Sequence, residues 1–64
     1  MIIRYFYDDK QWEHSVPLRD VEIQLNLTKK HGVTNLDADE LIVGNIYYNV
    51  AQNVIEVSLD EANA

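Results

Sequence analysis

The fold of this chain is decided first by the stretch IIRYFYDDKQWEHSV, residues 2–16. Residues 2–7 are rich in β-branched and aromatic side chains, and residues 11–16 alternate between apolar and polar side chains as a strand does. The DDK sequence between them has turn chemistry, because an aspartate side chain bonds to its own backbone two residues on. The stretch therefore predicts an N-terminal β-hairpin.

The next segment fits two structures. Over residues 21–28 apolar and polar residues alternate strictly, which is typical of a strand. However, residues 29–33, KKHGV, have the features of a helix end, with cations in the last turn and a glycine suited to a left-handed position. Residues 18, 21, 25 and 28 also share one helical face. We predict a helix over residues 19–31 and keep a strand as the alternative.

A second hairpin is predicted in the C-terminal half. Residues 41–50 and 54–59 have strand patterns, and residues 51–53 are suited to the turn between them. Gly44 interrupts the first of these strands, so we expect a bulge or a close backbone approach there.

The predicted elements give a single domain over residues 1–64, with a loop at 33–40 and a frayed tail at 60–64. Two hairpins around one helix predict an α+β fold, ββαββ, in which the helix covers one face of an antiparallel sheet. A five-stranded small barrel, all-β, is the alternative if the middle segment is a strand.

Composition restricts the function classes. The formal charge is −6, from 11 acidic and 5 basic residues, and a phosphate backbone repels such a chain. We therefore expect no direct binding of nucleic acid and favour a protein partner with a basic surface. There is no cysteine for a disulfide or a thiolate zinc site, and no apolar run long enough to predict a membrane contact. We expect a cytoplasmic protein.

The sequence does not predict an enzyme. Only His14 and His31 are bases near neutral pH, and Ser15, the neighbour of His14, should point to the opposite strand face. The two glycines are isolated, so no phosphate-binding loop is indicated. We expect no catalytic residues and no cofactor.

A partial calcium pattern lies in the acidic loop. Asn35, Asp37 and Asp39 have the spacing of the first three ligands of a calcium loop. Glu40 then stands in place of the turn glycine, and Ile46, which has no ligand atom, stands in place of the bidentate glutamate. We expect a solvated loop and no metal.

The six aromatic residues include adjacent ones, which a strand must place on opposite faces. A single helix covers only one face, so some of these rings should be available to a partner, for which tyrosine is a favoured contact residue. Trp12 is expected in the core instead. The possibility of a homodimer follows from the same surface.

Three acidic clusters occur along the chain, at residues 8–13, 37–40 and 60–61. A solubilising surface is one interpretation of them and steering of a basic partner is another. Our leading hypothesis is a non-enzymatic protein-interaction module, a small acidic regulator or inhibitor of a larger protein. A nucleic-acid mimic of phage or plasmid type, which occupies the basic channel of an enzyme, is the first alternative, and a structural homo-oligomer subunit is the second. The predicted partner-binding residues are Tyr5, Tyr7, Asp8, Asp9, Glu13, Asp37, Asp39, Glu40, Tyr47 and Tyr48.

Overall fold

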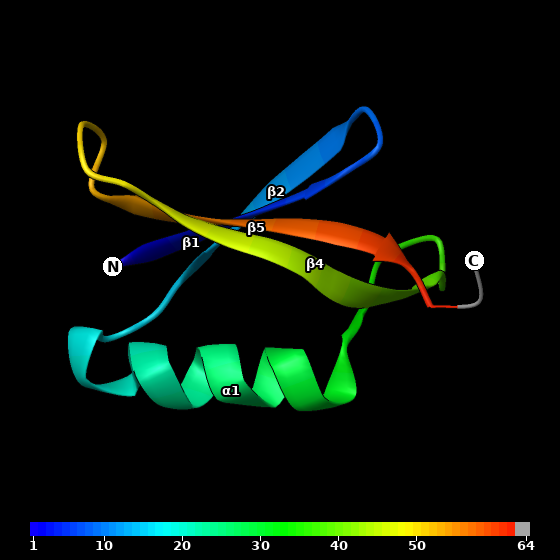
Figure 1. The fold of residues 1–64 in the computed structure, drawn as a ribbon, viewed down its shortest axis with the longest axis horizontal. Coiled ribbons are helices and arrows are strands. Elements are labelled where there is room, and N and C mark those ends of the chain that lie inside the picture. The colour runs from blue at the N-terminus through cyan, green and yellow to red at the C-terminus, as the bar shows by residue number, and fades with distance from the viewer. Residues whose placement is uncertain (63–64) are drawn as a thin grey trace.

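Both predicted hairpins and the predicted helix are present in the computed structural model, which describes residues 1–62 (Figure 1). The α+β fold class is therefore confirmed, and the middle segment is helical rather than extended. The elements, in chain order, are β1 (Ile2–Tyr7), β2 (Lys10–Ser15), the 3₁₀ turn η1 (Leu18–Asp20), α1 (Val21–His31), β3 (Val33–Thr34), β4 (Glu40–Asn49) and β5 (Val54–Glu61).

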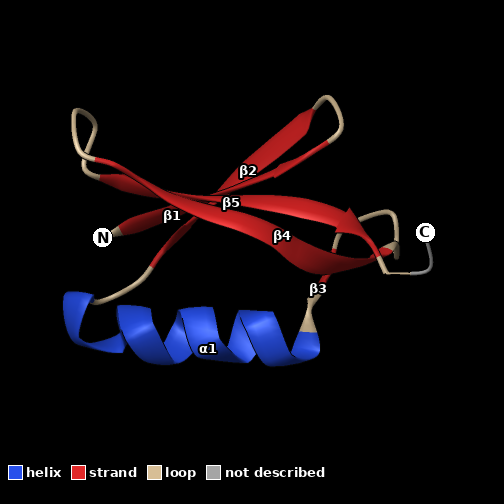
Figure 2. Ribbon diagram, in the orientation of Figure 1, coloured by secondary structure: helices blue, strands red, loops and turns tan. Residues whose placement is uncertain are grey.

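The five strands form one sheet in the order β2-β1-β5-β4-β3, with the helix on one side of it (Figure 2). The sheet is mixed, because β1 and β5 pair in parallel while the other neighbours are antiparallel. Our prediction of a wholly antiparallel sheet is therefore wrong for this one pair of strands. The helix carries the chain back to the end of the sheet at which β2 began, so β4 runs parallel to β2, and β5 runs parallel to β1.

The core lies between the sheet and the helix. Ile3 and Val57 are fully buried, and Tyr5 is 3% exposed, while the alternate residues of β1 face the other side of the sheet. The helix contributes Val21 and Leu25, which pack against this cluster. The face of β1 that carries Ile3 and Tyr5 therefore faces the core, which the sequence analysis did not predict.

The end of the helix follows its sequence signature. The N–H of Gly32 donates to the carbonyl oxygen of Thr28 at 2.8 Å, and Gly32 takes φ 73°. Lys29, Lys30 and His31 occupy the last turn. The positive charges of the two lysines interact favourably with the negative end of the helix dipole. Leu18, placed by periodicity on the buried helical face, instead lies in η1 and is 72% exposed.

The second hairpin contains the predicted bulge, since the pairing of β4 with β5 shifts register between Val43 and Asn45. The prediction of a tail beginning at residue 60 is wrong for Asp60 and Glu61, which belong to β5. The N–H of Ala62 donates to the carbonyl oxygen of Glu40, and residues 63–64 lie outside the described part of the chain. Pairing with β4 is what holds these residues in place.

Candidate interaction surface

The topology brings the three acidic segments to one end of the sheet, on the right in Figure 1. The segments at this end are the β1–β2 turn, the loop between β3 and β4, and the end of β5. They meet because β1 and β5 run toward this end, whereas β2 and β4 start from it. Two side-chain contacts join them: the hydroxyl of Tyr7 donates to Oε1 of Glu61 at 2.7 Å, and Lys10 pairs with Asp37. We define the acidic end by the carboxylates of Asp8, Asp9, Asp37, Asp39, Glu40, Asp60 and Glu61.

Seven of the eleven acidic side chains of the protein are located at the acidic end. Its seven carboxylates and the one ammonium of Lys10 give a formal charge of −6, equal to the formal charge of the whole chain. The other four acidic and four basic side chains cancel. Two of these basic residues, Lys29 and Lys30, lie in the last turn of α1, in the helical layer but at the same end of the molecule (Figure 1). With both lysines counted, this end has a formal charge of −4 and is still the most acidic part of the protein.

The carboxylates of the acidic end raise the pKa values of two side chains there, those of Tyr7 and Lys10. The hydrogen bond to Glu61, together with desolvation and the charges of Glu61, Asp39 and Asp8, raises the pKa of Tyr7 to about 12. The hydrogen bond to Asp37 and its charge raise the pKa of Lys10 above its ordinary value. Both shifts agree with a concentration of negative charge at this end of the sheet.

The loop between β3 and β4 is organised by Asn35. Its Oδ1 accepts the backbone N–H groups of Asp37 and Asp39, each at 3.0 Å, and its Nδ2 donates to Oδ2 of Asp39 at 3.2 Å. Ala38 adopts φ 63° within this turn. The Asn35 oxygen that the calcium pattern would use is therefore engaged by the loop's own backbone. Within residues 1–62, no three metal-binding side chains come together as a metal site would require.

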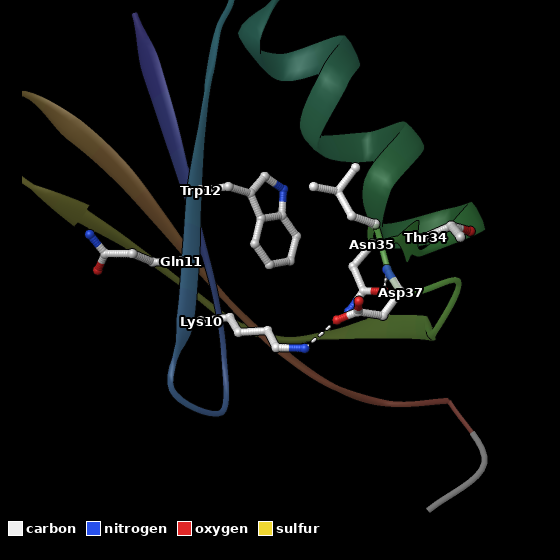
Figure 3. A pocket seen from close by; sticks show the side chains of 7 residues that line it. Lys10, Gln11, Trp12, Thr34, Asn35 and Asp37 are labelled. Carbon is white, nitrogen blue, oxygen red and sulfur yellow. Dashed lines mark hydrogen bonds and ion pairs between the residues drawn. The ribbon is translucent and has the colours of Figure 1, made fainter.

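A groove lies beside the acidic end, between β2 and the segment that follows β3 (Figure 3). It has a volume of about 470 Å³. Figure 3 shows Trp12 projecting from β2 toward Asn35, while Gln11 points away and the ion pair of Lys10 with Asp37 spans the opening. The lining residues are Lys10, Gln11, Trp12, Thr34, Asn35, Leu36 and Asp37.

Apolar side chains form part of the groove wall. The indole of Trp12 stacks on the ring of Tyr5, with centroids 5.6 Å apart and planes 22° apart. Leu36 lines the same groove with its side chain fully exposed. Trp12 is thus half-buried at the edge of the core rather than inside it, because β2 is an edge strand and the helix packs against β4, on the other half of the sheet.

The predicted tyrosine contacts are dispersed by the fold. Tyr5 is buried under the helix, so its prediction as a contact residue is wrong. Tyr7 lies at the acidic end, bonded to Glu61. Tyr47 and Tyr48 are 60% and 48% exposed toward the other end of β4, where the hydroxyl of Tyr48 donates to Asn53 in the β4–β5 turn.

Glu13 is separated from the acidic cluster with which the sequence grouped it. It lies on the sheet face opposite the helix, where Nε of Arg4 donates to its Oε2 at 2.7 Å. Glu56 lies 3.6 Å from the same guanidinium, and Gln52 accepts a further hydrogen bond from it. This face is therefore polar at its centre, where one guanidinium pairs with two carboxylates. Asp8 and Asp9, by contrast, are exposed at the acidic end with Asp37, Asp39 and Glu40.

The groove could not be found from the sequence. Its two walls come from opposite edges of the sheet, which are adjacent only because the sheet curls. His14 and His31 are exposed on different elements, and neither has a side-chain hydrogen bond within the described residues. The one α-helix described is too short and too polar to cross a membrane.

Scans against family models and searches of curated proteins and solved structures found nothing that this chain matches.

Proposed function

We propose that this protein is a non-enzymatic interaction module whose acidic end binds a basic surface of a larger protein and so regulates or inhibits it. The observation that carries the proposal is the placement of the charge: seven of the eleven carboxylates lie at one end of the molecule, which has a formal charge of −4 even when Lys29 and Lys30 are counted. A charge concentrated on one end orients a partner during approach, which a uniform solubilising charge does not do. The groove and the exposed apolar side chain of Leu36 adjoin this end and offer contact area after the encounter.

Nucleic-acid mimicry is a second candidate for the same surface. It gains support because the acidic segments gather at one end instead of spreading over the molecule. A basic channel that normally holds a phosphate backbone would be the partner's binding site in this case. Competition separates it from the broader proposal: the partner's own nucleic acid should displace the protein completely if the two share a channel, and should leave the complex intact if they do not.

The experiment compares two double variants with equal changes in charge. Asp8→Asn with Asp9→Asn removes two of the seven carboxylates of the acidic end, whereas Asp20→Asn with Glu22→Gln removes the same amount of charge at the start of the helix. Asparagine suits position 8 because Asp8 takes φ 55°, a conformation that asparagine tolerates. A partner captured from the native host by the wild-type protein is then measured for its association rate at low and at physiological salt.

We expect the Asp8→Asn, Asp9→Asn variant to associate with the partner at least about tenfold more slowly than the wild type at low salt. The difference should be smaller at higher salt, because salt screens the charges. The helix variant should retain the wild-type rate. Equal slowing of both variants, or no slowing of either, would contradict the proposal, because the position of the charge would then not matter.

A further inference from the structure

The outer edge of β2 is an unpaired strand edge. Met1 and Val16 exchange two backbone hydrogen bonds, of 2.9 and 3.0 Å, so they form a hydrogen-bonded pair at the start of the β1–β2 ladder. Such pairs alternate along an antiparallel ladder, which makes Lys10, Trp12 and His14 the other residues of β2 that bond to β1. The backbone groups that point outward are those of Gln11, Glu13 and Ser15.

This edge borders the groove. The side chain of Trp12 projects from β2 into it (Figure 3), and Leu36 is among the residues that line it. A strand added to the outer edge of β2 would have alternate side chains on the face of Trp12 and on the face of Gln11. Its side chains on the first face would enter the groove, whose volume of about 470 Å³ is within the range of ligand sites.

Charge selects the occupant. Asp8 and Asp9 lie at the tip of the hairpin that β2 belongs to, and Asp37 lines the groove. Lys10 is the one cation among the residues that line the groove, and it is already paired with Asp37. A second copy of this chain would bring another −6 to the same place, which opposes pairing of two β2 edges. A segment with basic side chains is favoured instead.

We propose, resting on the function proposed above, that the outer edge of β2 accepts an extended basic segment of the partner as an additional strand. Main-chain hydrogen bonds to Gln11, Glu13 and Ser15 hold the segment. An apolar side chain enters the groove against Trp12 and Leu36. Its neighbouring lysine or arginine side chains lie on the face of Gln11, where those nearest the tip of the hairpin meet the carboxylates of Asp8 and Asp9.

The experiment uses three synthetic peptides of equal length that contain no tryptophan. The first alternates lysine with valine or leucine, the second has the same composition in scrambled order, and the third has glutamate in place of lysine. Trp12 is the single tryptophan of the chain, so its fluorescence reports occupation of the groove. Hydrogen exchange of the amides of Gln11, Glu13 and Ser15 reports pairing along the edge.

The matched variants are Gln11→Pro and Gln11→Thr. Proline removes the outward N–H and leaves the ladder with β1 intact, which an edge strand tolerates, whereas threonine keeps the N–H. The alternating peptide should bind, change the Trp12 fluorescence and protect the three amides. Its affinity should fall about tenfold in Gln11→Pro and stay near the wild-type value in Gln11→Thr. The acidic peptide should not bind. If Gln11→Pro does not fold, protection of the amides in the wild type decides the question.

Several results would overturn strand addition. These are equal binding of the alternating and scrambled peptides, equal affinity of the two Gln11 variants, no binding of the alternating peptide at low salt, or self-association of the wild type through the same amides. Equal binding of both basic peptides that weakens in the Asp8→Asn, Asp9→Asn variant would leave the proposed function standing and remove only the strand pairing. Whether the proposed function itself fails is tested separately, by the association rates of the captured partner with the two double variants.

Discussion

Replacing Gly32 with alanine tests how the helix is joined to the sheet. Gly32 ends α1 and precedes β3, and it takes φ 73° and ψ −167°, a region that is almost restricted to glycine. A Cβ added there would also overlap the backbone carbonyl oxygen of Leu41, a fully buried residue of β4. Neither the backbone conformation nor that oxygen can adjust without moving the helix away from the sheet.

The expected loss follows from these two terms. The backbone conformation alone costs about 1–3 kcal/mol for a residue other than glycine, and the overlap with a backbone atom adds to it, so we expect about 3 kcal/mol or more. A domain of 64 residues has a free energy of unfolding of about 3–10 kcal/mol. The substitution should therefore lower the melting temperature by about 12 °C or more, or leave the chain unfolded.

Gly44→Ala is the matched control, because these are the two glycines of the chain. A Cβ at Gly44 would meet the carboxylate of Asp60, an exposed side chain that can rotate away. We expect the free energy of unfolding of this variant to stay within about 1 kcal/mol of the wild type. Thermal and chemical denaturation, both followed by far-ultraviolet circular dichroism, give the melting temperature and the free energy of unfolding of each variant. A Gly32→Ala protein that melts within about 4 °C of the wild type, or the reverse order of the two variants, would refute this reasoning.

Two further predictions concern the acidic end and the groove. Because the pKa of Tyr7 is raised from 10.0 to about 12 in the folded protein, its contribution to stability is complete below pH 10 and is lost as the pH rises toward 12. Tyr7→Phe should remove this part of the alkaline decline in denaturation experiments, and Glu61→Gln should let tyrosinate absorbance appear at lower pH; no change in either would contradict the hydrogen bond between them. Trp12→Ala should reduce the free energy of unfolding by about 1–3 kcal/mol, less than for a core tryptophan, because the indole is half-buried and stacked on Tyr5. Trp12→Phe should recover part of that loss in the same thermal melts, and full unfolding of Trp12→Ala would place the indole in the core after all.

The sequence by itself determined the local elements of this protein. The β-branched and aromatic residues at 2–7, the alternation of residues 11–16 and the DDK turn specified the first hairpin. The KKHGV signature specified the end of the helix, and Gly44 marked the bulge. These features depend on neighbours along the chain, such as turn chemistry and capping, which a single sequence contains.

Only the tertiary structure decided which distant segments meet. The helix returns the chain to the end of the sheet at which β2 began, and this gathers carboxylates that are up to 53 positions apart, from Asp8 to Glu61, at one end. The curl of the sheet brings Lys10 to Asp37 and forms the groove. The position of β2 at the edge leaves Trp12 half-buried, whereas Tyr5 is buried on β1, which has a strand on either side. Burial and charge density depend on strand order and sheet curvature, which result from packing of the whole chain and have no local signal in the sequence.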